Sequence, residues 1–150
     1  MNRLIGPAIV AVSVLAVTAA VAQNVTVIKE RQKHFEAMGK AVKGPVKMFK
    51  GEADFDLAKV QEALKVMQEK AAVLPKLFPD DSKKGEDTEA MAAIWENKTD
   101  FENRFKKLGD DAKAAAAGII DKATFDVQFK DVMGNCGGCH KKYRKEKEKS

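Results

Sequence analysis

The stretch LAKVQEALKVMQEKAAVL, residues 57–74, contains the most regular apolar repeat in this chain. Its apolar residues follow one another in steps of 3-4-3-4-3, and they are Leu57, Val60, Leu64, Met67, Ala71 and Leu74. Steps that average about 3.5 residues place these side chains on one face of an α-helix that packs at a shallow angle against a neighbour. Residues 57–74 are therefore predicted to form one helix of a bundle.

On either side of this stretch, residues 28–49, 94–119 and 125–143 show the same helical spacing of apolar residues. No segment alternates apolar and polar residues with the period of two that indicates a half-buried β-strand. Amphipathic helices joined mostly by short connections are typical of an antiparallel four-helix bundle. The sequence thus predicts an all-α domain of this kind over residues 23–150.

Residues that start, bend or end helices lie between these segments. Asp54 or Asp56 is placed to cap the second helix, and Asp121 to cap the fourth. Pro75 is expected to end the second helix, and a Gly-Pro pair at residues 44–45 to bend the first helix or fray it locally. These breaks separate the four predicted helices.

The first 22 residues differ from the rest of the chain. Arg3 gives a basic start, residues 4–19 carry no charge, and residues 20–22 read Ala-Val-Ala, a small-x-small cleavage site. This layout predicts a signal peptide over residues 1–22, cleaved after Ala22, and export to the periplasm. The alternative is an uncleaved membrane anchor, for which the apolar run is short.

The chain carries 27 Lys and Arg residues against 22 Asp and Glu residues, a formal net charge of +5. Much of this excess lies in residues 141–150, at the end of the predicted fourth helix. Nucleic-acid binding usually needs a basic face spread over the fold, whereas cations at a helix C-terminus are favourably placed in solvent. We therefore interpret the basic tail as a solvated helix end and expect no nucleic-acid partner.

The motif Cys-Gly-Gly-Cys-His at residues 136–140 carries the chemistry. Thiols at positions i and i+3 of a helix lie on one face, within reach of the two vinyl groups of a haem, and His140 at i+4 faces the same ring. This is the attachment pattern of c-type haem, and histidine is a common axial ligand of haem iron. The sequence predicts one covalent haem c per chain, with thioether bonds to Cys136 and Cys139 and an iron bond to His140.

Two other interpretations of this motif, a disulfide oxidoreductase and a zinc site, agree less well with the sequence. A disulfide oxidoreductase places its Cys-x-x-Cys pair at a helix N-terminus, where the dipole lowers a thiol pKa, but here the pair lies late in a helix. A tetrahedral zinc site needs four ligands, and His34 is the one other histidine in the chain.

The C-terminal block from Cys136 to Arg144 resembles that of cytochrome c′, the class II, four-helix-bundle family of c-type cytochromes. The first-helix run Arg-Gln-Lys-His-Phe at 31–35, the Lys-Gly-Glu turn at 50–52 and the Ile-Trp pair at 94–95 add to the resemblance. It covers residues 23–150. This resemblance implies a high-spin, five-coordinate haem iron without a distal protein ligand.

The resemblance also implies roles for single residues. Phe35 would block the distal side of the haem, Arg31 would neighbour a propionate, and Arg144 would lie near the proximal side. The full haem environment that it implies is Arg31, Gln32, Phe35, Trp95, Tyr143 and Arg144.

The function implied is electron transfer with NO or CO binding, not enzymatic catalysis. Two alternatives stay open: a low-spin, c-556-like electron carrier with Met38 as sixth ligand, and a haem enzyme such as a peroxidase, which would need a distal acid–base group. The expected partners are small redox proteins and a second copy of the chain. The homodimer would form through the first two helices, with Val46 or Met48 as exposed apolar contacts.

Overall fold

The computed structural model describes residues 12–85 and 88–146, with side chains from residue 25 onward. Its α-helices are α1 (Val12–Phe49), α2 (Leu57–Val73), α3 (Ala93–Glu96), α4 (Lys98–Gly118) and α5 (Lys122–Tyr143). Short 3₁₀ turns lie at Leu74–Leu77 and Asp80–Ser82. Within the described ranges no β-strand forms, and Ala90 and Arg144 make one isolated antiparallel bridge. The prediction of an all-α fold is confirmed.

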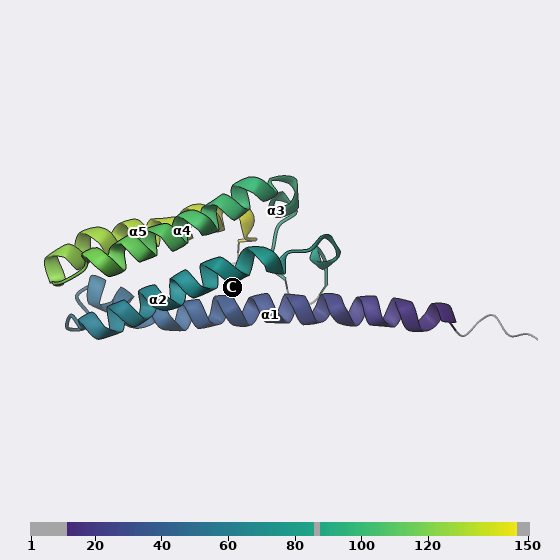
Figure 1. The fold of residues 1–150 in the computed structure, drawn as a ribbon, viewed down its shortest axis with the longest axis horizontal. Coiled ribbons are helices and arrows are strands. Elements are labelled where there is room, and N and C mark those ends of the chain that lie inside the picture. The colour runs from purple at the N-terminus through teal and green to yellow at the C-terminus, as the bar shows by residue number, and fades with distance from the viewer. Residues whose placement is uncertain (1–11, 86–87, 147–150) are drawn as a thin grey trace, which may run out of the picture.

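The four long helices form two antiparallel pairs (Figure 1). α1 lies beside α2, and α4 lies beside α5. The pairs meet mainly through α2 and α4, whereas α1 and α5 barely touch. This is the predicted antiparallel four-helix bundle, and α1 with α5 is the loosest of its neighbouring helix pairs.

Two predicted caps are observed. Asp56 caps α2 by accepting a hydrogen bond from the Lys59 amide at 3.1 Å, which decides between Asp54 and Asp56. Asp121 and Thr124 form a reciprocal capping box at the start of α5. The Asp121 carboxylate accepts from the Thr124 amide at 2.8 Å, and the Thr124 hydroxyl accepts from the Asp121 amide at 3.1 Å. These bonds satisfy amide groups that a helix start leaves without partners.

The Asp121 cap predicts a measurable loss of stability. Asp121→Ala is expected to lower the free energy of unfolding by about 1 kcal/mol, because the Thr124 amide loses its acceptor. Denaturant unfolding followed by circular dichroism measures the change. The matched control is Asp110→Ala, which removes an exposed ion pair with Lys106 at 2.6 Å and should cost less than about 0.5 kcal/mol. Equal effects of the two substitutions would contradict the cap.

Two details of α1 differ from the predictions. The helix does not fray at the Gly-Pro pair, since Pro45 is fully buried and the helix continues to Phe49. Packing of the proline ring thus holds a turn from which one amide donor is missing. Met48 was predicted to be an exposed contact but is 3 % exposed and belongs to the core, and Val46 packs against that core.

The third predicted helix is divided in two. The helical spacing from residue 94 to 119 is interrupted at Asn97, whose φ of −126° and ψ of 46° leave the helical region. The chain turns there between α3 and α4. The spacing did not reveal this break because Ile94 and Phe101, on either side of it, are both buried in the core.

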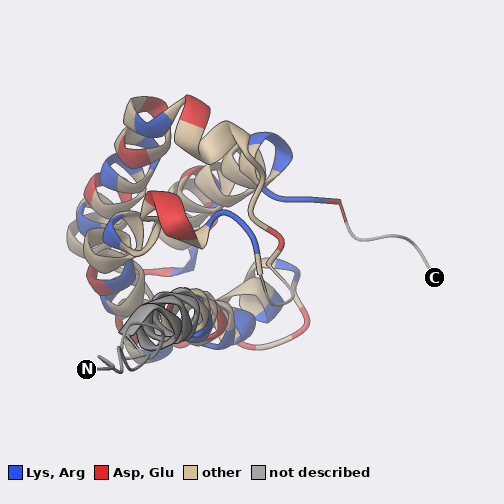
Figure 2. Cartoon of the chain, turned by 90° about the vertical axis from the view of Figure 1, so that its right-hand side faces the viewer, with Lys and Arg blue, Asp and Glu red and all other residues tan. Residues whose placement is uncertain are grey.

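Charged side chains of both signs are interspersed around the bundle (Figure 2). Lys141 and Lys142 lie exposed in the last turn of α5, where the predicted solvated helix end begins. Within the described residues, none of the helices combines the length and apolar character needed to cross a membrane. Residues 1–11 of the predicted leader and the side chains of residues 12–24 lie outside the described part, so cleavage after Ala22 stays a prediction.

Candidate functional site

A cavity of about 510 Å³ lies between α1 and α5, on the side of the bundle where these two helices barely touch. Its size is typical of small-molecule and cofactor sites, which run from about 300 to 1,000 Å³. Side chains from α2, α3, α4 and the segment 88–90 complete the wall. Most of this wall is apolar, and its polar groups come from a few side chains, namely Arg31, Gln32, Thr88, Glu89, Arg104, Asn135, His140 and Arg144.

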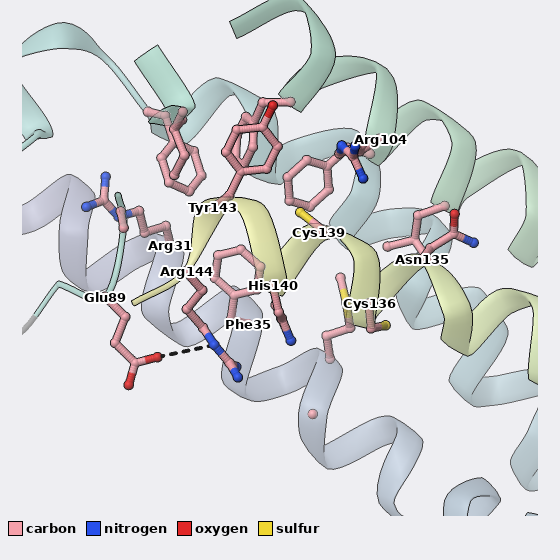
Figure 3. A pocket seen from close by; sticks show the side chains of 18 of the residues that line it. Arg31, Phe35, Glu89, Arg104, Asn135, Cys136, Cys139, His140, Tyr143 and Arg144 are labelled. Atoms are coloured by element: carbon pink, nitrogen blue, oxygen red, sulfur yellow. Dashed lines mark ion pairs between the residues drawn. The ribbon is translucent and has the colours of Figure 1, made fainter. Parts of the chain in front are cut away.

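The last part of α5 brings both cysteines and the histidine of the motif to this cavity. Cys136, Cys139 and His140 all line it (Figure 3). Both thiols are unpaired and half-buried. The helix continues without a break from Lys122 through the motif, so the i, i+3, i+4 spacing places the three side chains on one face, as predicted.

Burial raises the pKa of both thiols, and for Cys139 the Arg104 cation partly opposes this rise. A redox-active Cys-x-x-Cys pair requires the opposite, a lowered pKa at a helix N-terminus. Here the pair lies near the C-terminus of α5. The arrangement therefore favours cofactor attachment over thiol redox chemistry.

The imidazole of His140 is partly buried in the same wall. Burial lowers its pKa, the Arg144 cation lowers it further, and Glu89 acts in the opposite direction. Glu89 and Arg144 form an ion pair of 3.8 Å at the cavity edge (Figure 3). At neutral pH the ring is therefore uncharged, which is the form that binds a metal ion.

Phe35 and Met38 reach the cavity from α1, the helix that faces α5. Phe35 is 37 % exposed, and its ring centroid lies 6.2 Å from that of Phe105 on α4. Met38, one turn later, is 8 % exposed and belongs to the core. Both side chains that the sequence singled out for the distal side thus line the site.

The residues that line the cavity match the chemical groups of a haem. The site offers two unpaired thiols three residues apart, a neutral imidazole next to the second thiol, and a mostly apolar cavity of about 510 Å³. A planar, mostly apolar macrocycle with two vinyl groups and one open iron position uses all of these groups. The residues fit haem c.

Comparison with known proteins agrees with this chemistry. The Cytochrome C' family model matches residues 26–144.

The chain belongs to the cytochrome c′ family.

A cytochrome c′ of Rhodopseudomonas palustris is 44 % identical over 128 residues, which cover 85 % of this chain and 87 % of that protein. A cytochrome c-556 of Agrobacterium fabrum is 34 % identical over 121 residues, 80 % of this chain and 82 % of that protein. The solved structure of cytochrome c′ from Rhodopseudomonas palustris superposes with a TM-score of 0.80 at 43 % identity, and covers 81 % of this chain and 98 % of its own. As a member of this family, the chain carries covalently bound haem c.

Arg31, which the cytochrome c′ resemblance places near a propionate, is 3 % exposed and lines the cavity. Its guanidinium donates to Ser82 Oγ at 2.9 Å, to the Ser82 carbonyl at 3.1 Å and to Thr88 Oγ1 at 2.7 Å. It also lies 4.6 Å from the centroid of the Phe78 ring. Arg31 therefore fixes the segment that closes one end of the cavity, and contact with a propionate stays a prediction.

Trp95 is the one residue of the implied haem environment that does not line the cavity. Its indole N–H donates to the carbonyls of Phe78 and Pro79, both at 3.1 Å. Phe78, whose ring centroid lies 6.0 Å from that of Trp95, lines the cavity in its place. Contact of Trp95 with haem therefore stays a prediction, whereas Gln32, Tyr143 and Arg144 do line the wall.

Arg104 and Asn135 line the cavity, although the sequence analysis did not single them out. Arg104 follows Phe101 by three residues and precedes Leu108 by four, so a cation flanks the apolar stripe of α4. This position beside the apolar stripe is the sequence signal that could have identified Arg104 as a cavity residue. Asn135 gave no such signal.

Proposed function

We propose that this member of the cytochrome c′ family is a periplasmic electron carrier that also binds NO or CO at a five-coordinate haem iron. The observation that carries the proposal is the pairing of His140 on α5 with Phe35 on α1 in one cavity. The first side chain is a metal ligand in its neutral form, and the second has no atom that binds iron.

Cys136 and Cys139 would hold the haem by thioether bonds, and His140 would bind its iron. When bound, the haem supplies a one-electron couple and an iron position for small diatomic ligands. The residues of α1 determine what reaches that position. Phe35, Met38, Gly39 and Val42 form an apolar stretch of this wall, which favours uncharged gases over anions and peroxide, and the polar groups of α1 in the wall are Arg31 and Gln32. This wall supports a carrier and gas binder in preference to a peroxidase.

The second candidate is the low-spin, c-556-like carrier with Met38 as sixth ligand. Two observations favour it: the Met38 side chain lines the cavity, and a cytochrome c-556 is 34 % identical to this chain. We place it second because Phe35 lies at the position where the resemblance expects the blocking residue.

Optical spectra with a pair of α1 variants test the proposal. The reduced protein should show a broad, unsplit α band, and Met38→Leu should leave it unchanged. Phe35→Ala should lower the CO dissociation constant of the reduced protein about tenfold, because CO no longer displaces a ring whose partial burial contributes about 1.5 kcal/mol. A sharp, split α band that Met38→Leu abolishes would instead support the six-coordinate carrier.

We also propose that residues 1–22 direct export and are removed. The protein isolated from the periplasm should then begin at Gln23, which N-terminal sequencing and intact mass determine. A mass that includes residues 1–22 would contradict cleavage.

The homodimer is proposed through α1 and α2, with revised contact residues because Met48 is buried. Phe49, at the end of α1, is 40 % exposed, and Leu57, at the start of α2, is 37 % exposed. Light scattering on the haem-loaded protein, with Leu57→Lys as the disrupting variant, tests this contact, since Phe49 also packs against Phe125 and Phe129 of its own chain. A Leu57→Lys protein of unchanged mass in solution would contradict it.

A further inference from the structure

Side chains from α4 and α5 form a hydrogen-bonded cluster beside the haem-attachment motif, and they are Asp100, Arg104, Lys142 and Tyr143. All three donors meet the same oxygen, Asp100 Oδ2. Arg104 Nε donates at 2.8 Å and Lys142 Nζ at 3.0 Å, and the Tyr143 hydroxyl makes a short hydrogen bond to it. The cluster therefore ties the first turn of α4 to the last turn of α5.

The tyrosine at the centre of this cluster is well packed. Tyr143 is 3 % exposed, and its ring meets that of Phe101 edge-on with centroids 5.2 Å apart. The Arg104 guanidinium lies 5.7 Å from the Tyr143 ring centroid. Hydrogen bonds from Arg104, Tyr143 and Lys142 hold the pKa of Asp100 well below its usual range. The carboxylate is thus a charged acceptor at neutral pH, and hydrogen bonds to charged groups are the strong ones.

The backbone of the same α5 turn is held from the other side. The Met91 amide donates to the Tyr143 carbonyl at 3.1 Å, and the Lys145 amide donates to the Glu89 carbonyl at 2.8 Å. The end of α5 is therefore fixed between α4 and the segment 89–91, by side chain on one side and by backbone on the other.

His140 lies one turn before Tyr143 on α5. Among the described residues, no side chain forms a hydrogen bond with the His140 imidazole, so none orients the ring directly. Groups that orient a metal-binding histidine commonly change metal affinity or activity by about 10- to 100-fold when they are removed. The ring is attached to the last turns of α5, which the Tyr143 side chain holds against α4 and backbone bonds hold against the segment 89–91.

We infer that Asp100, acting through the Tyr143 hydroxyl, is a positioning residue that fixes the orientation of His140 toward the haem iron. The inference rests on the proposed role of His140 as iron ligand. It gives α4 a part in the site that the attachment motif on α5 does not contain, through the bond between Asp100 and Tyr143.

The test compares haem-loaded Asp100→Asn and Tyr143→Phe with the unsubstituted protein. The readouts are the haem methyl proton shifts of the oxidised protein, which depend on the orientation of the axial imidazole, and the CO dissociation constant. Both variants should keep covalent haem, move the methyl shifts in the same direction and change the CO dissociation constant about tenfold. Asp110→Asn is the matched control, since it removes a carboxylate of α4 that pairs with Lys106 away from the cavity, and it should change neither readout.

Three other outcomes would contradict the inference. If Tyr143→Phe leaves the methyl shifts unchanged while Asp100→Asn moves them, the effect is that of a lost charge and the inference is wrong. If both variants only lower the denaturation midpoint, the cluster is structural and the inference is wrong. If the unsubstituted protein has no covalent haem or no histidine ligand, the proposed function itself is wrong. In the two outcomes above, by contrast, the proposed function stands and the positioning role of Asp100 alone is wrong.

Discussion

The double variant Cys136→Ala/Cys139→Ala is expected to lose all covalently bound haem. Both thiols line the cavity, are unpaired, and are the chain's two cysteines, so no other residue forms a thioether bond. Haem staining of a denaturing gel and acid–acetone extraction measure the loss. The unsubstituted protein should keep its haem through extraction, whereas any haem bound to the double variant should leave with the solvent.

The spacer between the cysteines offers a matched control. Gly137 is exposed, and a Cβ built there meets nothing within 4 Å, so Gly137→Ala should keep covalent haem. The alanine also favours the helix by about 1 kcal/mol. Covalent haem in the double variant, or its loss in the control, would contradict attachment through these two thiols.

The second large effect is expected at the iron. His140→Ala should abolish the native absorption spectrum of the loaded protein, because the neutral imidazole on α5 is the proposed protein ligand. Added imidazole should restore a nitrogen-ligated spectrum, since the substitution leaves space in the cavity wall. Optical titration with imidazole, in the oxidised and reduced states, measures the rescue.

His34 provides the control for this experiment. It is the other histidine of the chain, it lies 3.9 Å from Glu30 on α1, and it does not line the cavity. His34→Ala should therefore leave the spectrum unchanged. A native spectrum in His140→Ala, or its loss in His34→Ala, would show that the iron ligand has been misassigned.

Within residues 57–74, periodicity predicted burial correctly at every position of the stripe except Leu57, which is 37 % exposed at the start of α2. The 3-4-3-4-3 steps in residues 57–74 placed Val60, Leu64 and Met67 in the core, because a regular apolar stripe has one way to avoid water. The predictions that were wrong concern residues whose burial or helical state depends on contacts with other helices. The burial of Met48 depends on how α1 sits in the bundle, and the helix break at Asn97 depends on the packing of α3.

The attachment motif shows how much can be predicted from the spacing of residues along one helix. Spacing placed Cys136, Cys139 and His140 on one face of a helix, and α5 confirms that they share a cavity. Spacing did not identify the opposite wall. Phe35 was named from family resemblance, and its place in that wall follows from the separation of α1 from α5.

The sequence by itself therefore determined the four helices, their apolar faces and the thiol–thiol–imidazole face that suits haem c, because each of these depends on residues within a few turns of one another. The tertiary structure alone decided which distant residues surround that face. Arg104 of α4 lines the same cavity as the motif, and Asp100 of α4 bonds Lys142 and Tyr143 just after it. Arg31 bonds Leu77, Ser82 and Thr88, and the Trp95 indole bonds the Phe78 carbonyl. Such contacts join residues far apart in the chain, so they depend on how the helices pack, which local spacing does not specify.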